Sequence, residues 1–130
     1  MRAIDSNIVI RLFVGDDKNQ LDIALTIIES PFLILPTVVL ESVWVLQAVY
    51  KLDRVELASK FSELIGHENA TSVSSDAIMW AIEHFALGAD FADMLHIALT
   101  SEADGSSFAT FDRGIAKYVS DDEMMIETFT

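Results

Sequence analysis

Short apolar segments that lead to an acidic residue constrain the fold of this chain more than any other feature. Four carboxylates follow such a segment directly or lie close behind it: Asp5, Glu41, Asp93 and Asp112. In a parallel α/β domain the carboxyl ends of the strands share one edge, and ligands bind there. Four carboxylates at that edge would repel one another unless a divalent cation joined them. The pattern therefore predicts a metal site.

Strand-like and helix-like patterns alternate along the whole sequence. Apolar runs predict strands over residues 3–5, 32–35, 71–74, 107–111 and 124–129. Helical periodicity and capping signals predict helices over residues 6–14, 17–29, 37–50, 53–66, 75–87, 90–103 and 112–119. This alternation indicates an α/β fold with a mostly parallel sheet covered on both faces. Neither a repeat nor a linker interrupts it, so we expect residues 1–130 to form a single domain.

Composition limits the classes of function. The 130 residues are 52% hydrophobic, typical of a packed domain, and the absence of cysteine excludes Cys-ligated zinc and iron–sulfur sites. With 8 basic against 21 acidic residues the net charge is −13, which excludes nucleic-acid binding through bulk electrostatics. Any such activity needs local basic groups, a metal or a second subunit. The sequence contains neither a signal-peptide pattern nor an apolar run of membrane-spanning length, and we expect a cytoplasmic protein.

Helix capping offers another explanation for the three aspartates. An Asp at a strand-to-helix junction accepts a backbone N–H and meets the positive end of the helix dipole. Asp5 and Asp112 stand at such junctions. Asp93 lies three residues after Asp90, so this pair has the spacing to cap one helix together. Taken singly, each Asp fits either role.

Glu41 does not fit the capping explanation. It lies in a predicted helix, residues 37–50, that is apolar almost all round, and a helix of that kind is typically buried. A carboxylate buried without a partner is destabilising or becomes neutral. Since the chain places no basic residue within one helical turn of Glu41, we expect the side chain to need a cation, a distant base or water.

Ligands that are all carboxylates favour a hard cation, Mg²⁺ or Mn²⁺, over zinc. Such an ion can orient and acidify a water, while a second ion stabilises the leaving oxygen of a phosphodiester. The best local phosphate contacts are Arg11, on the helix after Asp5, and Arg113 and Lys117, on one face of the helix predicted beside Asp112. We expect His96, Trp44 and Trp80 to be core residues. The alternatives are that His96 bonds a carboxylate or holds substrate, and that the tryptophans stack on bases.

Four short motifs, in this order, resemble those of the PIN-domain nucleases, particularly the VapC-type toxins of bacterial toxin–antitoxin pairs. They are Ile4-Asp5-Ser6-Asn7, Pro36-Thr37-Val38-Val39-Leu40-Glu41, Gly88-Ala89-Asp90-Phe91-Ala92-Asp93 and Phe108-Ala109-Thr110-Phe111-Asp112-Arg113. By position, the resemblance implies that the metal-binding and catalytic carboxylates are Asp5, Glu41, Asp93 and Asp112. It further implies that Asn7 or Thr110 orients them by hydrogen bonding. Asp90, one turn from Asp93, assists them or caps the helix.

The resemblance also implies a fold and an activity. The fold is a three-layer α/β/α sandwich with a mostly parallel five-stranded sheet. The activity is Mg²⁺- or Mn²⁺-dependent cleavage of RNA by a homodimeric toxin that a cognate antitoxin neutralises. Two other hypotheses remain open: a phosphoryl-transfer domain with Asp5 as acceptor, and a catalytically inactive PIN-fold binding module.

Overall fold

Residues 1–75 form one unit of the computed structural model, which describes all 130 residues. The strands of this unit are β1 (Arg2–Ala3), β2 (Phe32–Ile34) and β3 (Ala70–Ser72), in the order β1-β2-β3. Both strand pairs are parallel, with Leu33 opposite Ala3 on one side and Thr71 on the other. The carboxyl ends of the strands therefore share an edge, where Asp5 and the start of the helix that contains Glu41 follow.

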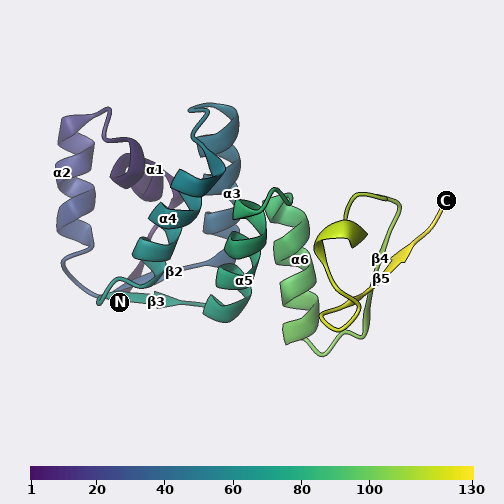
Figure 1. Cartoon of the computed structure of the whole chain (residues 1–130). Helices are drawn as coiled ribbons and strands as arrows, with labels where there is room; N and C mark the ends of the chain where they lie inside the picture. The colour runs from purple at the N-terminus through teal and green to yellow at the C-terminus, as the bar shows by residue number, and fades with distance from the viewer. The chain divides into compact units, whose positions relative to one another are not determined.

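Four helices complete this first unit: α1 (Ser6–Val14), α2 (Lys18–Ile27), α3 (Pro36–Ala48) and α4 (Arg54–Ile65). Helix α1 packs against both α2 and α3, and α4 contacts β3 (Figure 1). The core of the unit consists of fully buried side chains from the strands and helices, among them Val9, Phe32, Ile34, Leu46, Leu57 and Phe61.

Capping residues fix where these helices begin. Asp17 accepts a hydrogen bond from the backbone N–H of Gln20, and Asp53 accepts one from that of Glu56. Helix α3 begins at Pro36, one residue before the predicted start at residue 37. The fixed φ of proline suits the first helical position, where its missing N–H costs no hydrogen bond.

Residues 76–130 form the second unit. It contains α5, which starts at the boundary (Ser75–Ala86), α6 (Phe91–Glu102), β4 (Ser107–Thr110), a short 3₁₀ helix η1 (Ala116–Tyr118) and β5 (Met125–Thr128). Strands β4 and β5 are parallel neighbours, with Phe108 opposite Ile126 (Figure 1). Gly88, between α5 and α6, has a φ of 116°, and a Cβ there would lie 3.4 Å from the hydroxyl of Tyr118. The positive φ favours glycine, whereas the contact with Tyr118 would be an ordinary van der Waals contact.

The predicted α/β fold class is confirmed, with five strands in which every pairing is parallel. The prediction of a single five-stranded sheet is wrong, because the strands form a sheet of three and a sheet of two. Strand β1 is only two residues long, so it offers few backbone groups for a second neighbour. A single domain over residues 1–130 remains a prediction.

One predicted helix is wrong. Residues 112–119 form turns and the short helix η1 in place of an α-helix. The side chain of Asp112 accepts the backbone N–H of Gly114, which ties this stretch into a local turn that competes with helical hydrogen bonding. None of the six α-helices has the length and apolarity that crossing a membrane requires.

Candidate functional site

Three aspartates lie together in the second unit. Asp90 and Asp93 come from the start of α6, and Asp112 follows β4. They share a pocket of about 170 Å³, which we call the acidic pocket. Its other lining residues are Met94, Gly114, Ile115, Lys117 and Tyr118. The structure thus brings two of the predicted metal ligands, Asp93 and Asp112, to one pocket together with Asp90.

The two aspartates of α6 have different roles in the helix. Asp90 is the N-cap, and its Oδ2 accepts the backbone N–H of Asp93 at 3.0 Å. Burial raises the pKa of Asp93, and the nearby carboxylates of Asp90 and Asp112 raise it further, against a smaller opposing effect of His96. Crowded carboxylates of this kind are relieved by a cation, and all-oxygen ligands suit Mg²⁺ or Mn²⁺.

Asp112 is held in place by its own backbone surroundings. Its backbone N–H donates to the hydroxyl of Thr110 at 3.0 Å, and its Oδ1 accepts the N–H of Gly114 at 2.7 Å. The two bonds fix the carboxylate at the carboxyl end of β4. Oδ2 takes no part in either bond.

Asp5 caps α1 in the first unit. Its Oδ1 accepts the backbone N–H of Ser6 at 2.7 Å, and the side-chain amide of Asn7 lies 3.5 Å from its Oδ2. The carboxylate is exposed to solvent. It lies two residues beyond the last residue of β1, at the edge where the strands of the first unit end.

The predicted burial of Glu41 is wrong, because its side chain is exposed. Helix α3 packs against α1 and α4, and its buried residues are Val39, Ser42, Val43 and Leu46. Glu41 and Trp44 lie on its other side, and Trp44, expected in the core, is 66% exposed. Since water solvates an exposed carboxylate, burial no longer argues that Glu41 needs a cation. Its proposed role depends on its place in the second motif.

Asp5 and Glu41 belong to the first unit, and Asp90, Asp93 and Asp112 to the second. The structure contains no cluster of three or more His, Asp or Glu side chains that could hold a metal ion. The acidic pocket nevertheless has the chemistry of a hard-cation site: carboxylate oxygens, mutual repulsion and no thiol.

Of the three basic residues expected to contact phosphate, only Lys117 lines the acidic pocket. Arg113 does not share a helix with it, since the helix predicted there does not form. Arg11 is paired with Asp16 at 2.5 Å, and its Nε donates to Gln20 at 2.7 Å. The bond to Asp16 raises the pKa of Arg11, so this guanidinium is already engaged within its own unit.

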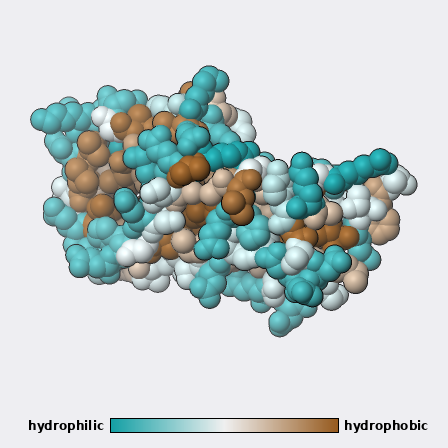
Figure 2. All heavy atoms as spheres, in the orientation of Figure 1, coloured by the Kyte–Doolittle hydropathy of each residue, from teal (hydrophilic) through white to brown (hydrophobic).

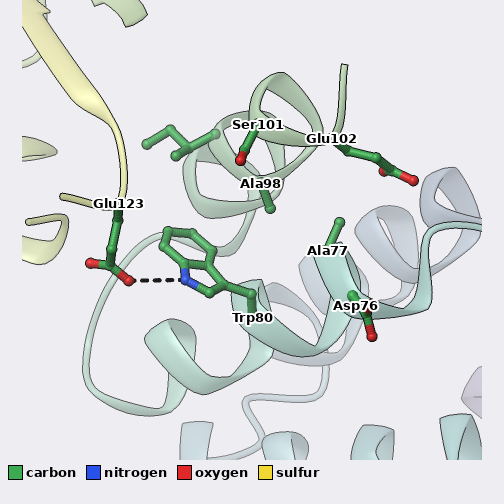
Figure 3. A pocket seen from close by; sticks show the side chains of 8 residues that line it. Asp76, Ala77, Trp80, Ala98, Ser101, Glu102 and Glu123 are labelled. Atoms are coloured by element: carbon green, nitrogen blue, oxygen red, sulfur yellow. Dashed lines mark hydrogen bonds between the residues drawn. The ribbon is translucent and has the colours of Figure 1, made fainter. Parts of the chain in front are cut away.

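A larger hollow of about 420 Å³ lies elsewhere in the second unit, beside Trp80 (Figure 3). The Trp80 indole N–H donates to Glu123 Oε2 at 3.0 Å, and its ring stacks on His84 with 3.8 Å between centroids. In Figure 3 the carboxylates of Asp76 and Glu102 point away from the indole. Since these polar groups do not converge, this hollow is a weaker candidate than the acidic pocket.

Sequence reasoning missed or misplaced several side chains near the predicted ligands. His96, expected in the core, is exposed. Tyr118 lines the acidic pocket, and no motif indicated it. Phe111, predicted as the end of a strand, is 79% exposed, since β4 ends at Thr110. The Asp-x-Gly turn after it is the sequence signal that could have placed Phe111 outside the strand.

Comparison with known families gives one match. A family model described as the PIN domain matches residues 3–120, a span that includes every predicted site residue and crosses from the first unit into the second. No curated protein matches the sequence.

Proposed function

The chain belongs to the PIN domain family, whose members are generally nucleases, and we propose that it is a metal-dependent endoribonuclease that hydrolyses RNA phosphodiester bonds. The observation that carries this proposal is the shared pocket of Asp90, Asp93 and Asp112. Burial raises the pKa of Asp93 most, and the carboxylates of Asp90 and Asp112 raise it further; a divalent cation would relieve this repulsion.

We assign the metal-binding and catalytic roles to Asp5, Glu41, Asp93 and Asp112, with Mg²⁺ or Mn²⁺ as the ion. When bound, the ion supplies Lewis acidity toward the attacking water and the leaving oxygen. The chain's own residues orient the ligands. Thr110 and Gly114 hold Asp112, the Ser6 N–H and Asn7 hold Asp5, and Asp90 caps the helix that carries Asp93.

Lys117 is the proposed phosphate contact. It lines the acidic pocket, and its ammonium lies 5.1 Å from the centre of the Tyr118 ring. A cation beside the carboxylates would attract an RNA phosphate that a chain with a net charge of −13 otherwise repels.

A toxin role, homodimerisation and neutralisation by an antitoxin in the cytoplasm follow from the resemblance to VapC-type toxins. Apolar side chains gather over α1 and α2 (Figure 2), and a hollow of about 230 Å³ between α1, α2 and α4 is lined by Leu12, Phe13, Leu25, Ile28, Lys60, Glu63, Leu64 and His67. An apolar hollow on an acidic protein suits a basic, amphipathic helix of an antitoxin.

RNA cleavage by the purified protein tests the proposed activity. We expect cleavage of single-stranded RNA with Mn²⁺ and none with a chelator. Asp112→Asn should reduce the rate more than about 100-fold, beyond the usual effect of losing an outer partner of a metal ligand. Asp76→Asn, at an exposed carboxylate outside the acidic pocket, is the matched control and should retain activity. Equal cleavage rates for Asp112→Asn and the wild type would overturn the role given to Asp112, and a wild type that cleaves no RNA would overturn the proposed activity and favour an inactive binding module.

A further inference from the structure

Lys117 and Tyr118 are neighbours in η1, and both line the acidic pocket. The Lys117 ammonium lies over the Tyr118 ring, 5.1 Å from its centre, where the face of an aromatic ring attracts a cation. Successive side chains of a 3₁₀ helix point about 120° apart, because the helix has three residues per turn. The contact is therefore not a consequence of adjacency in the sequence, and the lysine side chain bends toward the ring.

Lys117 forms no ion pair with the carboxylates that share its pocket. Asp90, Asp93 and Asp112 line this pocket with it, and opposite charges at short range attract each other. No oxygen of these three side chains nevertheless lies within 4.0 Å of the ammonium. The lysine is exposed, so a molecule in solution can reach its charge. The ammonium is therefore available to an anionic group from outside the protein.

Tyr118 is held between η1 and the loop that joins α5 to α6. Ile115 and Val119, on either side of η1, are buried, and they anchor this short helix on the second unit. A Cβ built on Gly88 would meet the Tyr118 hydroxyl at 3.4 Å and two ring carbons at 3.8 and 4.0 Å, so the far end of the ring lies against the backbone of that loop. The ring therefore offers a fixed surface to the long lysine side chain.

We propose that Tyr118 is a positioning residue whose ring holds the Lys117 ammonium beside the acidic pocket, out of an ion pair with its carboxylates, so that the ammonium binds a substrate phosphate. This inference rests on the proposed nuclease function and deepens it, because it names the residue that directs the proposed phosphate contact. A lysine side chain has many rotamers, and restricting them before the substrate binds reduces the entropy cost of the contact.

Replacement of the ring tests this role. Tyr118→Leu keeps an apolar side chain but removes the aromatic face. It should raise KM for RNA about two- to fivefold, as expected for an exposed cation–ring contact, with little change in kcat. Tyr118→Phe keeps the face, and this matched control should retain the KM of the wild type. An unchanged KM in Tyr118→Leu, or an equal increase in both variants, would overturn the proposal.

A double-mutant cycle tests whether Tyr118 acts through Lys117. Lys117→Met removes the charge and should raise KM more than Tyr118→Leu does. Once the charge is absent, adding Tyr118→Leu should have no further effect on KM. A merely structural role of Tyr118 would raise KM by the same factor in both backgrounds, and this result would overturn the proposal. Lys18→Met, at an exposed lysine that does not line the acidic pocket, controls for the loss of one charge and should retain KM.

Proton NMR tests the contact without RNA or metal. The ring current of residue 118 should shift the ε-methylene protons of Lys117 upfield in the wild type and in Tyr118→Phe, and Lys117→Met identifies their signal. This comparison does not require Tyr118→Leu to fold. Absence of the upfield shift would overturn the ring contact and leave the nuclease proposal intact. Failure of the wild type to cleave any RNA would refute the nuclease function, and with it the phosphate role of Lys117, whatever the NMR shift.

Discussion

Asp90 caps helix α6 by accepting the backbone N–H of Asp93 at 3.0 Å. From the sequence, each of these two aspartates could cap the helix or bind a metal, and this bond shows that Asp90 is the cap. Asp90 accepts a backbone N–H at the start of the helix. The side chain of Asp93, one turn later, does not cap the helix, and Asp93 lines the acidic pocket. Asp93 is therefore the member of the pair suited to binding a cation.

Removing the cap should cost stability. We expect Asp90→Ala to lower the free energy of unfolding by about 1 kcal/mol, the usual effect of losing an N-cap. Asp90→Ser should be nearly neutral, because a serine hydroxyl also accepts the helix N–H groups. Urea denaturation of the metal-free protein measures both. Equal stability of the alanine and serine variants would show that the cap contributes nothing.

Neutralising Asp93 should stabilise the metal-free protein. Its pKa is raised above the ordinary value of an aspartate, so the folded state binds this proton more tightly than the unfolded chain does. The group therefore favours folding below pH 3.8 and loses that contribution as pH rises through its folded pKa. At pH 7 with chelator, Asp93→Asn should raise Tm by about 2 °C, a small value because solvent screens a partly exposed group.

Added Mn²⁺ should reverse that order. A ligand that binds only the folded state stabilises it by mass action, so the wild type should gain more from the ion than Asp93→Asn does. Thermal denaturation with and without Mn²⁺ measures this difference. A variant that is less stable than the wild type in chelator, or that gains as much from the ion, would contradict the role given to Asp93.

Glu123 should show the opposite dependence on pH. The backbone N–H of Ser120 lowers its pKa most, with further help from the Trp80 indole, the Ser120 hydroxyl and His84. Its ionised form therefore stabilises the fold above the ordinary pKa of a glutamate, and this contribution disappears as pH falls through the lower folded pKa. Glu123→Gln should lower Tm at pH 7 and match the wild type near pH 3. A constant difference across this range would refute the assignment.

Thr110 should matter for activity more than for stability. Its hydroxyl accepts the backbone N–H of Asp112, so it positions a proposed ligand without binding the ion itself. We expect Thr110→Val to reduce cleavage about 10- to 100-fold, and Thr110→Ser to retain most of it. Circular dichroism should show little change in Tm for either variant. Full activity of Thr110→Val would mean that this bond does not orient Asp112.

Local signals in the sequence predicted the secondary structure well, because they act over one or two turns. Asp17, Asp53 and Asp90 each cap a helix near its predicted start, and the strands lie within about two residues of the expected runs. The error at residues 112–119 is also local, since the turn held by Asp112 and Gly114 competes with a helix.

Features that depend on distant packing could not be predicted. Strand pairing depends on which segments meet, and the sequence pattern does not encode that β4 pairs with β5 alone. The exposure of Glu41 and Trp44 depends on which side of α3 meets α1 and α4. An apolar helix with a free side indicates a surface for a partner or substrate, a distinction that hydrophobicity alone does not make.

Calorimetric titration of Mn²⁺ into the metal-free protein tests the central claim most directly. If carboxylates from both units bind the ion together, then Asp5→Asn and Glu41→Gln should weaken binding at least about tenfold, as much as Asp93→Asn and Asp112→Asn do. Asp76→Asn should bind like the wild type. Failure of the wild type to bind Mn²⁺, or unchanged affinity in Asp5→Asn and Glu41→Gln, would contradict the account.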